Sequence, residues 1–241
     1  MPALKLLRAL AHAVAGWLTI LFVFPRIDAP AREAHVQVWS VKMLRILGVR
    51  LRVHGRPVAA GPVLLVANHI SWLDILAMHA ARYCRFVSKA DIQRWPLVGT
   101  LATGAGTLYI QREKRRDALR VVHSMTQSLQ AGDVVAVFPE GTTGDGTALL
   151  PFHGNLIQAA LAADAPVQPL GLRYVDAASG EPSFAARYIA QDTLIGSAWR
   201  LLRSAPIEAV VAFGEPHGAE GRDRRQWAHD LQAQVEALRR G

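Results

Sequence analysis

The chain has 241 residues, a formal net charge of +8 and a single cysteine, which excludes an intrachain disulfide. This length buries one good-sized core, so one domain with a small N-terminal appendage is the simplest organisation. The positive charge suits an anionic membrane surface or acidic ligands, and its spread along the chain without a recognisable motif argues against a nucleic-acid-binding protein.

The N-terminus carries an uncharged, largely apolar run, residues 9–24, with Lys5 and Arg8 before it. As a helix, this run spans about 24 Å, less than the roughly 30 Å hydrocarbon core of a bilayer. It therefore fits a re-entrant or interfacial helix as well as a full span. A cleaved signal peptide is the alternative, although the segment 29–31 matches a cleavage site poorly.

Residues 33–47 predict a second helix, whose apolar positions recur at i, i+3 and i+4 and suit either a core or a membrane. Together with the run 9–24, it predicts N-terminal helices over residues 1–48, at a core or a membrane, followed by a larger domain over residues 49–241.

A buried strand is predicted for residues 63–67, because this short β-branched run follows a Gly-Pro pair and is too short for a helix. Ser71 is typical of a helix N-cap, and Asp74 three residues later completes a capping box. His69 then lies in the turn between strand and helix. Across such a turn His69 and Asp74 can meet, whereas within one helix they would not share a face.

The pairing has a chemical use. An imidazole accepts a proton from a hydroxyl near neutral pH, and a carboxylate bonded to its other ring nitrogen fixes the tautomer and stabilises the imidazolium. His69 and Asp74 are therefore a candidate catalytic dyad. The alternative is that Asp74 only caps the helix and His69 is a satisfied turn residue.

Two further strands end in polar residues. Residues 106–112 predict a strand ending in Arg112, whose side chain suits bidentate phosphate binding. Residues 134–138 predict an apolar strand that opens through Glu140 into a loop rich in glycine and threonine. Such a loop lets backbone N–H groups approach an anion, and an ionised Glu140 suits a polyol hydroxyl. A solvated arginine and an ordinary surface turn are the alternatives.

Other helices are predicted for residues 73–81, 117–130, 156–163 and 222–240, and other strands for residues 51–53, 167–174 and 207–213. This alternation implies an α/β fold in which helices flank a mixed β-sheet. Cys84 lies in an apolar run and is more typical of strand core than of a nucleophile. The sequence has no G-x-S-x-G elbow, P-loop or H-E-x-x-H motif, and we expect no metal site.

Taken in order, these segments resemble the glycerolipid acyltransferase family, typified by bacterial 1-acylglycerol-3-phosphate acyltransferases. The four sequence blocks of that family are matched by residues 68–74, 106–112, 138–142 and 165–170. A stretch between the first two blocks is similar to residues 86–91 and 95–99. The resemblance runs from about residue 50 to 215, and the correct order and spacing of all four blocks make it specific.

The resemblance implies that His69 acts as the base and that Asp74 orients it. The free hydroxyl of a lysolipid would then attack the thioester carbonyl of acyl-CoA or acyl carrier protein, with no cofactor and no covalent enzyme intermediate. The lysolipid implied first is 1-acylglycerol-3-phosphate. The substrate-binding residues that the resemblance carries over are Arg112 for the acceptor phosphate, Lys89, Asn68, Glu140, Gly141 and Thr142.

One departure concerns the third block, which in the family usually continues with Arg and Ser where this chain has Thr143 and Gly144. The change removes one cation from the acceptor-phosphate site, and a charge-assisted contact is worth roughly 1.5–3 kcal/mol. The continuation found here is similar to that of relatives that acylate lyso-ornithine lipid, which is therefore an alternative acceptor.

The expected partners are a membrane lysolipid and an acyl-CoA or acyl carrier protein. The expected location is the inner (cytoplasmic) membrane, with the catalytic domain facing the cytoplasm. Two alternative functions remain: a hydrolase or transacylase that uses the same dyad, and a non-catalytic basic membrane-binding module.

Overall fold

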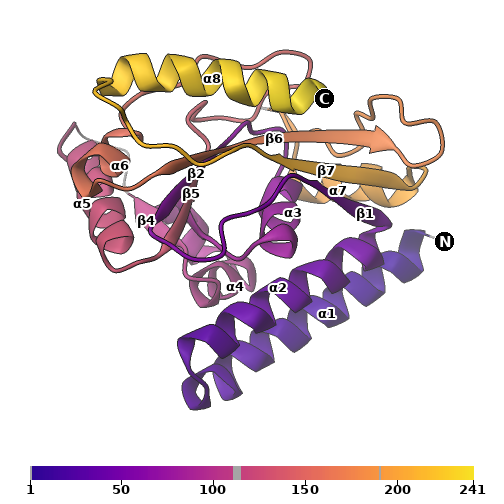
Figure 1. Cartoon of the computed structure of the whole chain (residues 1–241). Helices are drawn as coiled ribbons and strands as arrows, with labels where there is room; N and C mark the ends of the chain where they lie inside the picture. Colours follow the sequence, from indigo (N-terminus) through magenta and orange to yellow (C-terminus); the bar gives the residue numbers. More distant parts are fainter. Residues whose placement is uncertain (1, 111–114, 190) are drawn as a thin grey trace.

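The structure is a computed structural model that describes residues 2–110, 115–189 and 191–241. Its centre is a seven-stranded sheet in the order β1-β7-β6-β2-β5-β3-β4, with helices on both faces (Figure 1). β6 and β7 are antiparallel and all other neighbouring strands are parallel. The predicted α/β fold with a mixed sheet is confirmed.

The strands are β1 (Val49–His54), β2 (Val63–Ala67), β3 (Arg85–Lys89), β4 (Leu108–Ile110), β5 (Val134–Val137), β6 (Val167–Asp176) and β7 (Ile207–Phe213). The α-helices are α1 (Pro2–Phe22), α2 (Ala29–Leu47), α3 (Leu73–Ala81), α4 (Val98–Gly104), α5 (Arg115–Gln130), α6 (Gln158–Ala163), α7 (Leu194–Arg203) and α8 (Arg224–Arg240). Two short 3-10 helices are η1 (Phe24–Arg26) and η2 (Ala90–Arg94).

The central strand β2 is buried on both faces, which explains its unbroken apolar sequence. Its alternate side chains enter two separate core layers. Leu65 packs in the layer that includes α2, α3 and α7, whereas Leu64 packs in the layer that includes α5, α6 and α8. Trp227 of α8 is fully buried in the second layer. The sheet therefore holds one core layer on each side.

The connections form a switch point at the carboxyl ends of β2 and β5. The chain leaves β2 through α3 on one face, and it leaves the neighbouring strand β5 towards α6 on the other face. At such a switch point the two connections diverge, and the space beyond the carboxyl ends of the strands is the usual ligand site of open α/β sheets. The segments that follow β2 and β5 carry the candidate site residues.

The N-terminal helices α1 and α2 lie side by side along the body of the molecule (Figure 1). Trp39 of α2 stacks on His12 of α1, and each side chain bonds to the other residue's carbonyl oxygen. The lack of a side chain at Gly16 makes room for Trp39, because a Cβ at residue 16 would lie 2.5 Å from Nε1 of the tryptophan. α2 also places Leu44 and Leu47 in the core layer that contains α3. A domain boundary at residue 48 stays a prediction.

α1 is long and apolar enough to cross a membrane by length and composition. It nevertheless packs against α2, α4 and α7 along one side. The apolar side chains on its other side are exposed, namely Leu4, Leu7, Leu10, Val14, Leu18, Leu21 and Phe22. These residues, the α1 stripe, share one helical face.

Some boundaries differ from the predicted ones. The helix after β2 begins at Leu73, so Trp72 occupies its cap position instead of Ser71. The hydroxyl of Ser71 accepts from the Leu73 N–H, and the Asp74 N–H donates to the Ser71 carbonyl instead. The strand predicted for residues 106–112 is described as Leu108–Ile110. α4 and α7 were not predicted: α4 has only seven residues, whereas α7 carries an amphipathic pattern that the prediction missed.

His79 offers a test of the packing around α3. Its ring contacts Tyr83 and Phe86, and burial lowers its pKa to about 4. The unfolded chain protonates this group near pH 6.5, so the unfolded state binds more protons as the pH falls from there towards 4.

We therefore expect the contribution of His79 to stability to be complete above about pH 7 and to fall by about 1 kcal/mol per pH unit below about pH 6. Urea unfolding of the wild type and of His79→Leu at pH 7 and pH 5 measures this. The free energy of unfolding of the variant, relative to that of the wild type, should be higher at pH 5 than at pH 7. The same relative value at both pH values would contradict the burial of a neutral ring.

Candidate active site

His69 and Asp74 meet across the turn between β2 and α3. The imidazole Nδ1 lies 2.8 Å from Oδ2 of Asp74. Since a carboxylate only accepts hydrogen bonds, Nδ1 carries the proton and the lone pair of the ring is at Nε2. The side chain of His69 is 20% exposed, whereas that of Asp74 is fully buried. A buried carboxylate therefore orients a base that solvent and ligands can reach.

Asp74 is held by four hydrogen bonds. Its Oδ2 also accepts from the backbone N–H groups of Ile70 at 2.7 Å and Ser71 at 2.9 Å. Its Oδ1 accepts from the phenol of Tyr174 on β6 at 2.6 Å. Burial, and secondarily the neighbouring carboxylate, raise the pKa of Tyr174 well above its ordinary value, so the phenol stays a donor. These donors compensate the desolvation of the charge and fix the carboxylate against rotation.

The ring of His69 lies flat on the ring of Phe138, with a centroid separation of 3.9 Å and an interplanar angle of 6°. Phe138 follows β5 and stacks in turn on Phe86 of β3. The base is thus fixed at one nitrogen by Asp74 and on one face by an aromatic ring. Both restraints reduce the freedom of the imidazole before any substrate binds.

Glu140 joins the dyad turn to the loop that follows β5. One carboxylate oxygen accepts from the backbone N–H of His69 at 2.6 Å, and the other accepts from that of Leu150 at 2.8 Å. Burial raises the pKa of Glu140, and the two backbone N–H groups oppose this shift. Gly144 adds a second contact between the loop and the turn, because its N–H donates to the His69 carbonyl at 2.8 Å. The structure thus uses both oxygens of Glu140 to position backbone.

Asn68 has a comparable positioning contact. Its side-chain N–H donates to the carbonyl of Leu172 at 3.0 Å, and its side-chain oxygen accepts from the Leu172 N–H at 2.7 Å. The amide continues the pairing of β2 with β6 one step beyond the end of β2. This contact sets the direction in which the chain enters the dyad turn.

The loop of residues 141–147 lies beside the dyad turn. Gly141 has φ of +72°, a conformation that favours glycine, and both Gly141 and Thr142 are exposed. Arg239 of α8 donates to the carbonyls of Gly146 and Thr147, each at 3.0 Å. The loop is therefore held by the contacts of Glu140 at one end and by Arg239 of α8 at the other, and its residues between them include the exposed ones.

Two predicted cations belong to the edge strands. Lys89 is exposed and ends β3, where it pairs with Ile110 of β4. The parallel strands β2, β5, β3 and β4 end at the same edge, so Lys89 lies at the edge that carries His69. Arg112 lies outside the described residues.

Sequence reasoning missed several residues that shape this site. Tyr174 was placed on a strand but not paired with Asp74, because no local pattern reveals a contact across 100 residues. The indole of Trp72 donates to the Ser197 hydroxyl on α7 at 2.9 Å. The N–H of Tyr188 donates to the Ile70 carbonyl at 3.0 Å. The segment before α7 thus also packs on the dyad turn.

That segment brings a further cation close to the loop. The charge of Arg187 helps to lower the pKa of Asp145, after the hydrogen bonds that Asp145 accepts from Thr147. Arg187 also lies over the ring of Phe184, 5.4 Å from its centroid. Its sequence position, outside all four blocks, gave no sign of this proximity.

Other candidate chemistries find little support among the described residues. No cluster of three or more His, Cys, Asp or Glu side chains in this part of the chain could hold a metal ion. Cys84 is fully buried in the core, and burial raises the pKa of its thiol. This agrees with the structural role predicted for Cys84. The chemistry that the site supports is proton abstraction from a hydroxyl by an oriented imidazole.

Comparison with known proteins agrees with this geometry. Residues 50–173 match the family model described as Acyltransferase. A lyso-ornithine lipid O-acyltransferase of Pseudomonas aeruginosa is 35% identical, over 94% of this chain and 87% of that protein. A 1-acyl-sn-glycerol-3-phosphate acyltransferase of Neisseria gonorrhoeae is also 35% identical, over 81% of this chain and 76% of that protein.

Among solved structures, the 1-acyl-sn-glycerophosphate acyltransferase of Thermotoga maritima is similar with a TM-score of 0.68. The match covers 98% of this chain and 95% of that chain at 17% sequence identity, and it shows a shared fold. The family model spans the strands and turns that build the dyad and its supporting loop. The chain belongs to the acyltransferase family.

Proposed function

We propose that this enzyme transfers an acyl group from acyl-CoA or acyl carrier protein to the free hydroxyl of a lysolipid, without a cofactor. The observation that carries the proposal is the 2.8 Å contact between His69 and the buried Asp74 in a member of the acyltransferase family. The orientation of this contact leaves Nε2 as the basic nitrogen on a partly exposed ring.

In the proposed reaction, Nε2 of His69 takes the proton of the lysolipid hydroxyl while that oxygen attacks the thioester carbonyl. Asp74 stabilises the imidazolium that forms. The tetrahedral intermediate then collapses, the C–S bond breaks, and the imidazolium returns the proton to the departing thiolate. Backbone N–H groups near the dyad or in the loop that contains Gly141 are the proposed donors to the oxyanion.

The proposed acceptor is 1-acylglycerol-3-phosphate, which would give phosphatidic acid. Its phosphate would bind at the edge where Lys89 ends β3. The family resemblance adds Arg112, two residues after β4 in the sequence, as a phosphate ligand. Exposed Thr142 at the loop suits a contact with the polar head group. Glu140 and Asn68 support this site through backbone contacts, so their proposed roles are to position the dyad turn.

Lyso-ornithine lipid is a second candidate acceptor. Thr143 stands where the family's third block usually carries arginine, which reduces the positive charge expected at the site. The Pseudomonas aeruginosa relative, named for that acceptor, matches a larger share of this chain than the Neisseria gonorrhoeae relative does. Arg187, placed near the loop by its effect on Asp145, offers a different cation for an anionic head group.

We further propose that the enzyme works at the inner (cytoplasmic) membrane, with its catalytic domain in the cytoplasm. The α1 stripe supports contact with lipid, because large exposed apolar surfaces are uncommon on proteins that only meet water. Since α1 packs on α2, α4 and α7 along its other side, an orientation in the plane of the interface fits better than a full span.

The dyad gives the direct test. His69→Ala should lower kcat/KM by at least ~10²-fold, because it removes the general base. Asp74→Asn should also lower it, through loss of tautomer control and of the charge beside the imidazolium. Acyl transfer from labelled acyl-CoA to a lysolipid measures both. His123→Ala, an exposed histidine on α5, is the control and should keep full activity.

The same assay separates the alternatives. Release of free fatty acid at equal rates with and without lysolipid would indicate a hydrolase. Acyl transfer that persists in His69→Ala would refute the proposed role of the dyad.

Tyr174 is proposed as a positioning residue. Tyr174→Phe removes the hydrogen bond to Oδ1 of Asp74, so the carboxylate loses one of its four restraints and kcat should fall about 10-fold with little change in KM. Steady-state kinetics at saturating lysolipid measure this. Tyr83→Phe is the matched control, because its hydroxyl bonds to Ala105 away from the dyad. Equal losses in the two variants would mean that Tyr174 acts only on stability.

An acceptor panel decides the head group. With one acyl donor, lysophosphatidate, lysophosphatidylethanolamine and lyso-ornithine lipid should differ in kcat/KM, and lysophosphatidate should give the highest value. Thr143→Arg should then raise the preference for lysophosphatidate about 10-fold, since a charge-assisted contact to phosphate is worth roughly 1.5–3 kcal/mol. A wild-type preference for lyso-ornithine lipid would select the second candidate.

A further inference from the structure

Helix α7 presents a surface that the proposed chemistry does not use. Ile195 is 84% exposed, Trp199 is 39% exposed, and Arg203 is also exposed. Their spacing of four residues puts them on one side of the helix, which we name the α7 face. Ser197 and Leu201 are buried on the opposite side, and Leu202 is buried at the border of the α7 face. An isoleucine and a tryptophan exposed on one side form an apolar patch that marks a candidate contact surface.

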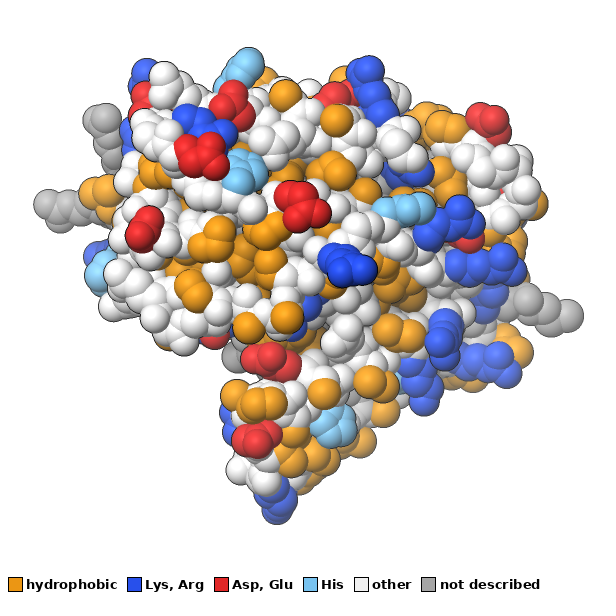
Figure 2. Space-filling view, in the orientation of Figure 1, with side chains coloured by type: hydrophobic (Ala, Val, Ile, Leu, Met, Phe, Trp, Pro, Cys, Tyr) orange, Lys and Arg blue, Asp and Glu red, His pale blue; other side chains and the backbone are white. Residues whose placement is uncertain are grey.

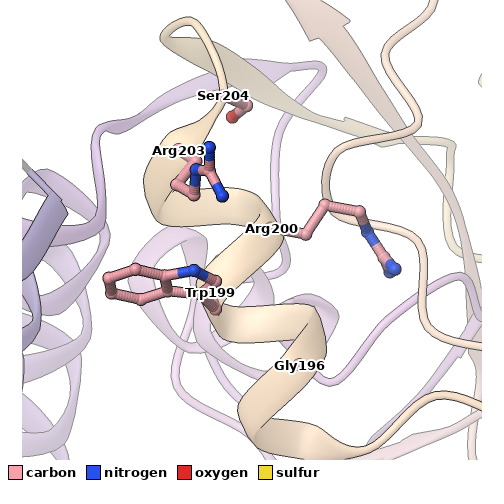
Figure 3. A pocket seen from close by; sticks show the side chains of 5 residues that line it. All are labelled: Gly196, Trp199, Arg200, Arg203 and Ser204. Carbon is pink, nitrogen blue, oxygen red and sulfur yellow. The ribbon is translucent and has the colours of Figure 1, made fainter.

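Figure 3 shows how the side chains of this helix divide. Trp199 and Arg203 lie on one side of the ribbon, and Arg200 extends from the other. Arg200 is committed to Asp192, which two of its nitrogens reach at 3.0 Å, and it also bonds to the Arg187 carbonyl. A shallow hollow of about 490 Å³ includes Trp199 and Arg203 in its lining. The hollow has room for a polar head group beside the indole.

The α7 face is close to the surface with which we propose that the enzyme meets lipid. α7 packs against α1, whose outer side carries the α1 stripe. The contacts of His12 and Gly16 with Trp39 hold the inner side of α1 on α2, so the stripe stays turned outward. Figure 2 shows hydrophobic and basic side chains gathered over this N-terminal part of the molecule.

The residue types of the α7 face match the boundary of a bilayer. Tryptophan prefers the level of the head groups, where its ring is in an apolar setting and its N–H meets polar groups. Arginine extends its charge towards lipid phosphates while its stem lies along apolar surface. Isoleucine adds apolar area that enters the acyl boundary. Arg203 and the net charge of +8 complement an anionic lipid.

We propose that the α7 face is a second membrane contact, which enters the interface of an anionic phospholipid bilayer beside α1. This inference rests on the proposed membrane association and adds to it. One helix in the interface leaves the protein free to roll about that helix. A second contact on a different element removes this freedom and sets one orientation of the catalytic domain against the lipid.

Hydrogen bonds connect α7 and the segment before it to the dyad turn. The buried side of α7 accepts the Trp72 indole N–H at the Ser197 hydroxyl, 2.9 Å away. Trp72 precedes α3, two residues before Asp74. The segment leading into α7 also bonds to the dyad turn, from Tyr188 to the Ile70 carbonyl at 3.0 Å. The depth of α7 in the interface therefore sets the position of His69 relative to the acceptor.

The first test measures the depth of Ile195. The full-length protein with Ile195→Cys is labelled with an environment-sensitive fluorophore, since the native Cys84 is fully buried. Vesicles of phosphatidylethanolamine and phosphatidylglycerol should shift the emission to the blue and raise it at least ~2-fold, and spin-labelled lipid should quench it. His229→Cys on α8, whose side chain is 87% exposed and which covers the other sheet face, is the matched control and should not respond.

The outcomes are distinct. A label at residue 195 that stays aqueous while the protein co-sediments with vesicles overturns the α7 proposal and leaves membrane association intact. Failure to co-sediment overturns both. A blue shift without vesicles, in step with dimer formation, would assign the α7 face to a second copy of the chain and also overturn the proposal.

The second test is functional. Ile195→Glu combined with Trp199→Glu should weaken vesicle binding at least ~10-fold and slow acylation of vesicle-embedded lysolipid, while acylation of a water-soluble short-chain lysolipid stays unchanged. Leu119→Glu, which changes a 73% exposed apolar residue on α5, is the control and should bind vesicles as the wild type does. Equal binding by the double variant and the control would refute the proposal.

Discussion

The arrangement of the site depends on one buried carboxylate. Asp74 is fully buried, and its charge is acceptable there because four donors surround it: an imidazole, two backbone N–H groups and the phenol of Tyr174. Three donors belong to consecutive residues, His69, Ile70 and Ser71, and the fourth comes from β6. The backbone donors require the tight turn after β2, and the phenol requires the long strand β6 beside it. A fold that lacked this turn or strand β6 would leave the buried carboxylate without its donors.

Direct contacts join the turn after β2 to the segment that follows β5. Glu140 and Gly144 bond to the backbone of His69 from the loop after β5, and Phe138 supports the ring. These contacts lie beneath the exposed residues of the loop, Gly141 and Thr142. Supporting contacts and the exposed residues proposed for substrate binding thus belong to one segment of chain after β5.

Much of this could be predicted from sequence, because the signals are local. The β-branched run 63–67 gave β2 without error, and the spacing of His69 and Asp74 across a turn gave the dyad. The backbone contacts of Asn68 and Glu140 were not predicted. Their side chains bond to the backbone of Leu172 and Leu150, and their roles in substrate binding stay predictions. Tyr174 and the α7 segment were missed because their contacts with the turn join residues about 100 or more positions apart.

The double link of Glu140 to His69 and Leu150 has an evolutionary consequence. A change in loop length that displaces Glu140 or Leu150 would also displace the backbone of His69. Insertions and deletions between these anchors are therefore disfavoured, whereas exchanges of exposed side chains such as Thr142 are not. Among descendants of this enzyme, new head-group preferences should arise by point substitution within a loop of constant length.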